Sequence, residues 1–101
     1  MLNVVRSRGG TPVRLTDERW AHIVEGHNEL AGMRLDVLEA VAEAERVLQG
    51  RAGECLALKE HEPGKWLVAV YREFERDGFI ITAFLTRRIG SLDRRRQIWP
   101  P

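Results

Sequence analysis

Two of the three histidines lie in residues 14–30, which read RLTDERWAHIVEGHNEL. Zinc binding is the first chemistry that two histidines on one helix suggest, and it needs them four residues apart on the same face. His22 and His27 are five residues apart, so a helix turns them about 140° away from each other. No carboxylate–histidine cluster elsewhere has metal-ligand spacing. The sequence therefore indicates neither a metal nor another cofactor.

The helix that would position both histidines has a clear start. Thr16 is a suitable N-cap, and Asp17 and Glu18 follow where the helix dipole favours negative charge. An apolar stripe then follows i, i+3, i+4, i+7 spacing at Trp20, Ile23, Val24 and His27. We expect this helix over residues 17–30, with His27 on its apolar face, His22 toward solvent and Gly32 as a left-handed cap.

Further elements follow in a simple order. Residues 11–15 predict a short strand, and residues 1–5 can add an edge strand. Residues 34–49 predict a second helix with a purely structural role, whose inner stripe includes Leu35, Leu38 and Leu48. Three strands are then predicted at residues 54–62, 65–75 and 79–89. A type II turn at Pro63-Gly64 and a type I′ hairpin at Asp77-Gly78 join them into an antiparallel meander.

The predicted fold class is therefore α+β: a short N-terminal strand, two α-helices, then a three-stranded antiparallel meander, with the helices packed on one face of the sheet. In the last strand, the apolar alternate positions should face the helices: Phe79, Ile81, Ala83 and Leu85.

Size and composition fit a globular domain. The 101 residues form one domain (1–101), with a core of about residues 11–90 and a basic C-terminal tail at 91–101. No apolar run approaches the roughly 20 residues that cross a bilayer, and the first residues lack a secretory signal. A lone Cys55 within a predicted strand indicates a buried thiol and a cytoplasmic location.

Charge is distributed unevenly along the chain. Residues 1–16 carry three arginines and no acidic group, and residues 63–101 carry eight basic and four acidic groups. Residues 17–62 between them carry five basic and eleven acidic groups. The two basic ends can attract phosphate if they meet on one surface, whereas a solvated helix pair with a basic tail is the plainer interpretation.

Two segments resemble a known family. RLTDERWAHIVEGHNEL at the start and GFIITAFLTRRI in the last predicted strand are similar to phage-type nuclease domains of the barnase–EndoU–colicin E5/D–RelE group, or BECR fold. That subgroup shows an RLT-x-E-R-W-x-H-I-x-E-R-H-P-E start and an I-x-T-A-Y final strand. The resemblance covers roughly residues 11–90. Gly26, Asn28 and Phe84 stand where the pattern has Arg, Pro and Tyr.

The resemblance implies a small phage-related toxin that cleaves RNA without a metal. Such a hydrolase needs a base for the 2′-hydroxyl proton, an acid for the leaving 5′-oxygen and donors for the phosphate charge. His27 and His22 are the acid–base candidates, and Thr82 can bind a phosphate oxygen or orient a histidine. Arg87 or Arg88 can hold the phosphate, and Tyr71 can replace the missing strand hydroxyl. The implied partners are RNA, such as tRNA or mRNA, and a small antitoxin protein, with no membrane.

Each candidate also has a plainer role. His27 can be a hydrogen-bonded packing residue, His22 a solvent-exposed one and Thr82 an ordinary strand residue. Arg87 and Arg88 alternate on a strand, so at most one faces any site. The alternative function is therefore a non-catalytic RNA- or protein-binding module of the same fold, which the replacements at Gly26 and Phe84 favour. A cleft shared by a histidine, Thr82 and an arginine would distinguish the two.

Overall fold

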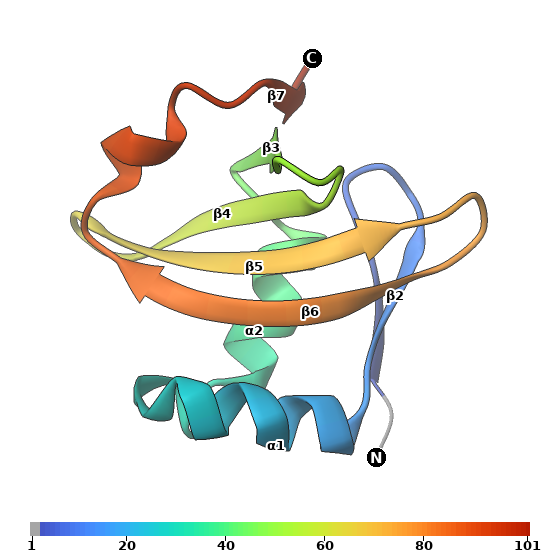
Figure 1. Ribbon diagram of the computed structural model, residues 1–101, viewed down its shortest axis with the longest axis vertical. Helices are drawn as coiled ribbons and strands as arrows, with labels where there is room; N and C mark the ends of the chain where they lie inside the picture. The colour runs from blue at the N-terminus through green and yellow to red at the C-terminus, as the bar shows by residue number, and fades with distance from the viewer. Residues whose placement is uncertain (1–2) are drawn as a thin grey trace.

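The computed structural model describes residues 3–101, which fold into two helices and one seven-stranded mixed sheet (Figure 1). Its strands are β1 (Asn3–Arg6), β2 (Pro12–Leu15), β3 (Arg46–Gln49), β4 (Cys55–Glu62), β5 (Lys65–Glu73), β6 (Gly78–Thr86) and β7 (Gln97–Trp99). The α-helices are α1 (Asp17–Gly26) and α2 (Arg34–Ala42), and the 3-10 helices are η1 (Asn28–Leu30) and η2 (Ile89–Leu92). The α+β class is confirmed.

The sheet is larger than the predicted meander. Its strand order is β1-β2-β6-β5-β4-β3-β7, and among these pairs only β2 with β6 is parallel. The predicted meander forms its centre as β4, β5 and β6, and four further strands flank it. The prediction of three strands was therefore an undercount. Met1 and Leu2, which the expected edge strand includes, lie outside the described residues.

Of the two turns predicted within the meander, the structure agrees with the first and not with the second. Gly64 has a φ of +78°, as the predicted type II turn requires. The predicted two-residue hairpin at Asp77-Gly78 was wrong, because residues 74–77 form a longer connection closed by Phe74 N–H donating to the Asp77 carbonyl at 2.7 Å. Gly78 is instead the first residue of β6, where a Cβ atom would clash with the backbone carbonyl of Arg72.

The predicted second helix was too long. α2 ends at Ala42, and Arg46–Gln49 is strand β3, paired with β4 and β7. Val47 and Leu48 are both buried but on opposite sheet faces, which a strand allows and a single helix stripe does not. Pairing on both sides overrides the helix propensity of this stretch. Leu35, expected on the inner stripe, is 74% exposed.

The first helix is also shorter than predicted. α1 ends at Gly26, and the chain continues through His27 into η1 rather than as one helix to residue 30. Gly32 has a φ of +81°, so the left-handed conformation expected there is present after η1. This change of helix type at His27 redirects the chain toward α2.

A β-bulge changes which side chains of β6 face the helices. Tyr71 pairs with Ile80 and Val70 with Thr82, so Ile81 is the extra residue. Ile80 and Ala83 therefore both enter the helix-side core, and Leu85 packs against it. Phe79 and Ile81, predicted to face the helices, are not part of that core.

Hydrophobic side chains are buried on both faces of the sheet. The helix-side core lies between the sheet and the helices, and its helical members include Ile23, Leu30, Val37 and Val41. On the other face Leu48, Leu56, Leu58 and Val68 form a second core, against which Ile89 and Leu92 of η2 pack. Residues 91–101 are therefore not a simple tail: they complete η2, add strand β7 and help to cover the second face (Figure 1).

Candidate functional site

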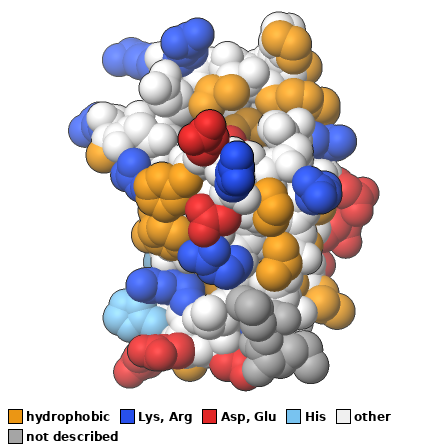
Figure 2. All heavy atoms as spheres, turned by 90° about the vertical axis from the view of Figure 1, so that its right-hand side faces the viewer, with side chains coloured by type: hydrophobic (Ala, Val, Ile, Leu, Met, Phe, Trp, Pro, Cys, Tyr) orange, Lys and Arg blue, Asp and Glu red, His pale blue; other side chains and the backbone are white. Residues whose placement is uncertain are grey.

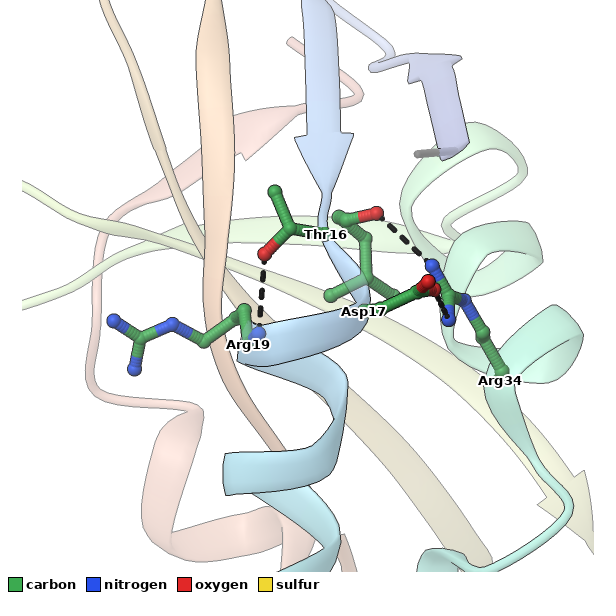
Figure 3. A network of polar contacts seen from close by, with 5 residues as sticks. Thr16, Asp17, Arg19 and Arg34 are labelled. Atoms are coloured by element: carbon green, nitrogen blue, oxygen red, sulfur yellow. Dashed lines mark hydrogen bonds and ion pairs between the residues drawn. The ribbon is translucent and has the colours of Figure 1, made fainter. Parts of the chain in front are cut away.

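The start of α1 is fixed by an N-cap bond of its own and by polar contacts with the start of α2. The Thr16 hydroxyl accepts a hydrogen bond from Arg19 N–H at 3.1 Å, as predicted for the N-cap. Arg34, at the start of α2, reaches Asp17 at 2.6 Å and donates to the Leu15 carbonyl at 3.2 Å (Figure 3). These bonds tie the end of β2 and the first turns of both helices together, so α1 leaves the sheet at a defined angle.

That angle sends α1 along an incomplete edge of the sheet. β2 pairs with β6 only at Val13–Gly78 and Arg14–Phe79, after which the chain turns into α1. Beyond Phe79 the free edge of β6 has no strand neighbour, and α1 runs beside it (Figure 1). A helix at an edge can contact residues of both sheet faces. Histidines on α1 can therefore approach the mixed face of β6, although the helices cover the opposite face.

The resulting cleft contains three of the predicted site residues. It encloses about 290 Å³ between α1 and β6, and it is lined by Arg19, His22, Ile23, Gly26, His27, Ile81 and Thr82. His22 and His27 come from the helix side and Thr82 from the strand side. The arginine that shares the cleft is Arg19, rather than Arg87 or Arg88.

His27 lies at the end of α1 between polar and aromatic neighbours. Its side chain is 37% exposed, and Nδ1 lies 3.5 Å from a carboxylate oxygen of Glu29. Its ring centroid is 6.4 Å from that of Phe84 on β6. Because Glu29 lies on the Nδ1 side of the ring, Nε2 is the nitrogen that forms no ion pair among the described residues. An imidazole with a carboxylate beside one nitrogen can use the other as a proton acceptor.

His22 is a more open neighbour. Its side chain is 73% exposed, and its nearest charged partner is Glu25, with Nδ1 4.0 Å from the carboxylate. The solvent-facing position expected for His22 is therefore observed, yet its location on the cleft rim leaves it available to a bound molecule. An exposed imidazole at the rim can exchange protons with both a ligand and water.

Three predicted binding residues lie away from the cleft. Arg87 is near Glu62 at 3.9 Å, and Arg88 is exposed just before η2, beyond the end of β6. Tyr71 is 1% exposed in the helix-side core, where burial is the main cause that raises the pKa of its hydroxyl. The expectation that Tyr71 supplies a substrate-binding hydroxyl is therefore wrong, because no ligand in solvent can reach it.

Arg19 and Glu29 are the residues that sequence reasoning missed. Arg19 precedes His22 by three positions and Gly26 by seven, so the three share one side of α1. That spacing was the available signal for Arg19. Glu29 had no such signal, because its contact with His27 depends on the transition from α1 to η1.

Gly26 keeps the cleft open. A Cβ atom at this position would have no heavy atom within 4 Å, so a larger side chain could extend into free space there. Local packing therefore leaves room for a side chain at this position. Among the described residues, Arg19 is the one guanidinium that lines the cleft.

Within residues 3–101, no group of three or more His, Cys, Asp or Glu side chains is arranged to hold a metal ion. The helices of the same residues are all too short or too polar to traverse a lipid bilayer. Comparison of the chain with protein-family models, curated protein sequences and solved structures gave no significant match.

Proposed function

We propose that this chain is a metal-independent endoribonuclease of the toxin type, acting on RNA in the cleft between α1 and β6. One observation carries the proposal: His22, His27, Thr82 and Arg19, from two separate elements, line a single open cleft. Two imidazoles, a guanidinium and a hydroxyl are the groups that phosphodiester cleavage by internal attack requires.

The reaction assigns one step to each group. His27 Nε2 takes the proton of the 2′-hydroxyl, and the 2′-oxygen attacks the adjacent phosphorus. The bond from phosphorus to the 5′-oxygen then breaks, and His22 gives that oxygen a proton. Arg19 and the Thr82 hydroxyl donate to the phosphate oxygens as negative charge builds on them. The products are a 2′,3′-cyclic phosphate and a free 5′-hydroxyl.

The direct test is cleavage of RNA by the purified protein in the presence of a metal chelator. His27→Ala should lower the rate by about a hundredfold or more, because general acid–base groups contribute about that much. His61→Ala is the matched control: His61 is exposed on β4 and does not line the cleft. An oligonucleotide with 2′-deoxyribose at the cleaved position should resist cleavage, because it lacks the attacking 2′-hydroxyl. Equal rates for His27→Ala and His61→Ala would refute the assignment.

The toxin role adds a cellular expectation. Induced expression in the cytoplasm should arrest growth, and His27→Ala and His22→Ala should relieve the arrest. Co-expression of a small antitoxin protein should also restore growth. If growth arrest persisted with both histidines replaced, the toxicity would not result from the proposed RNA cleavage.

A non-catalytic binding module is the second candidate function. Gly26 and Phe84 favour it, because they stand where the resembling family has Arg and Tyr. This candidate predicts salt-sensitive binding of RNA with no turnover. Intact RNA after prolonged incubation, together with such binding, would decide for it.

A further inference from the structure

A second pocket lies at the opposite end of the molecule from α1, where η2, β7 and the turn after β3 meet (Figure 1). It encloses about 680 Å³ and is lined by Gln49, Gly50, Arg51, Gly90, Ser91, Arg94, Arg95 and Arg96. Four of these eight residues are arginines, and no lining side chain is apolar. Arg51 comes from a different part of the chain than Arg94–Arg96, so the fold itself gathers this charge.

The positive charge of this pocket, which we call the arginine pocket, exceeds the negative charge beside it. Among the described residues, the four guanidiniums form no ion pair or side-chain hydrogen bond, and the Nε atom of Arg95 is buried without a partner. The neighbouring acidic groups are already engaged. Asp93 pairs with Arg46 at 2.9 Å, and Glu54 accepts from Ala52 N–H at 2.8 Å.

Glu54 is a carboxylate with an electrostatic link to the pocket. It interacts with both Arg72 and Arg95, and backbone hydrogen bonds are the main cause that lowers its pKa. One carboxylate shared between two arginines leaves an excess of positive charge. Figure 2 shows the face seen from the right-hand side of Figure 1, where basic side chains at the upper end have no acidic neighbour and acidic and basic side chains lie close together lower down.

The segment that carries Arg94–Arg96 is held in place rather than loose. Gln49 N–H donates to the Arg96 carbonyl at 2.8 Å, and Arg46 Nε donates to the Gln97 side chain at 2.8 Å. The guanidinium of Arg8 stacks on the Trp99 ring, 4.3 Å from its centroid. Backbone pairing and this cation–π contact therefore hold the backbone that carries Arg94–Arg96, while the guanidiniums themselves stay available to a ligand.

We propose that the arginine pocket binds the sugar–phosphate backbone of a single-stranded nucleic acid, which the proposed function makes RNA. Guanidinium forks match phosphate oxygens, and the volume falls in the range of ligand sites, larger than one phosphate needs. An acidic protein segment would also find cations here. Protein interfaces, however, combine a polar rim with an apolar core, and this pocket has no apolar side chain.

In this arrangement the arginine pocket anchors RNA away from the reacting phosphate. The cleft between α1 and β6 performs the chemistry, and the pocket supplies affinity without sequence preference. The choice of RNA rests on the proposed function, but the binding of a phosphate backbone does not.

The test uses the full chain and a fluorescent single-stranded RNA with 2′-O-methyl riboses, which cannot be cleaved by internal attack. The probe's anisotropy reports binding. A variant with Arg94→Ala, Arg95→Ala and Arg96→Ala should bind about tenfold or more weakly. Its slope of log affinity against log salt should fall by about two, because each lost phosphate contact removes about 0.7. Arginine-to-lysine replacements at the same positions should retain most of the binding.

The matched control removes the same charge elsewhere, with Lys65→Ala, Arg76→Ala and Arg87→Ala, none of which lines the pocket. Equal weakening by both triple variants would overturn the proposal. Thermal melting checks that the variants fold. Arg51→Ala, on a turn remote in sequence from residues 94–96, gives an independent second variant, and unchanged binding by it would also count against the pocket.

Competition distinguishes the ligand class, and His27→Ala distinguishes the two proposals. Poly-glutamate that displaces the probe as effectively as a DNA or RNA strand would assign the pocket to an acidic protein and overturn the nucleic-acid proposal. His27→Ala should bind the probe normally. Binding through the arginine pocket without any RNA cleavage would refute the proposed function and leave this inference standing. RNA cleavage and binding that do not change when the arginines are replaced would support the proposed function and refute this inference.

Discussion

Tyr71 and Cys55 lie directly opposite each other on β5 and β4, with both side chains in the helix-side core. Burial is the main cause that raises the pKa of both groups above their ordinary values of 10.0 and 9.0. Their protonated, neutral forms are therefore the ones that the fold stabilises. Tyr71, which the sequence suggested as a substrate-binding residue, is therefore a core residue whose contribution to the free energy of unfolding depends on pH.

This predicts a loss of stability in alkali that depends on Tyr71. Above about pH 10 the unfolded chain releases the tyrosine proton while the folded chain keeps it, so the free energy of unfolding falls by about 1.4 kcal/mol per pH unit for this group. Tyr71→Phe removes that component, and its stability should fall less steeply. Urea unfolding from about pH 8 to about pH 11, with a reducing agent present, measures both curves. Parallel curves would contradict the prediction.

At the scale of elements, β3 shows that strand pairing can determine the conformation of a segment whose sequence favours a helix. Residues 34–49 are rich in helix formers, yet the last four form a strand whose adjacent side chains, Val47 and Leu48, are buried on opposite faces. Leu48 thereby belongs to the second core, while Leu35 projects into solvent from α2. The helix predicted over residues 34–49 assigned both leucines to its inner side, and the structure buries only Leu48.

Two leucine substitutions test this assignment. Leu48→Ala should lower the free energy of unfolding by about 2–5 kcal/mol, because Leu48 is fully buried and its removal leaves a cavity. Leu35→Ala should change it by less than about 0.5 kcal/mol, because that side chain is 74% exposed. Chemical denaturation of both variants gives the comparison. A loss for Leu48→Ala as small as that for Leu35→Ala would contradict the burial of Leu48 in the second core.

At the scale of the whole molecule, the C-terminal segment completes the fold as well as the arginine pocket. Ile89 and Leu92 cover the second core, and β7 protects the outer edge of β3. Trp99 also contacts Arg8, so the turn between β1 and β2 lies beside β7, although the two ends of the described chain lie at opposite ends of the molecule (Figure 1). Arg8 also donates to the Ala44 carbonyl, so this contact ties the turn to the segment after α2 as well.

Truncation after Arg88 should therefore expose the second core. We expect the melting temperature to fall by about 10 °C or more, because several kcal/mol of packing and strand pairing are lost in a domain of this size. The truncated chain should also bind a hydrophobic dye such as ANS. Deleting Pro101 alone is the control and should change neither measurement. A truncated chain that melts like the full one would show that the segment is dispensable.

The sequence by itself determined the features that depend on near neighbours. Thr16 as an N-cap, Gly64 in its turn, the central three strands and the α+β class all follow from local preferences and from periods of two or 3.6 residues. The histidines and Thr82 could be selected as candidates by residue type and resemblance. Their roles in the cleft remain the proposal made above.

Only the tertiary structure decided which distant segments meet. The strand at Arg46–Gln49, the bulge at Ile81 and the placement of α1 along the free edge of β6 depend on pairing between residues far apart in the chain. Because of those contacts, Arg19 lines the cleft, Tyr71 is buried in the helix-side core, and Arg51 lines the same pocket as Arg94–Arg96. Local propensities are worth a few tenths of a kcal/mol per residue, whereas burial and strand pairing are worth several times more, so the distant contacts prevail.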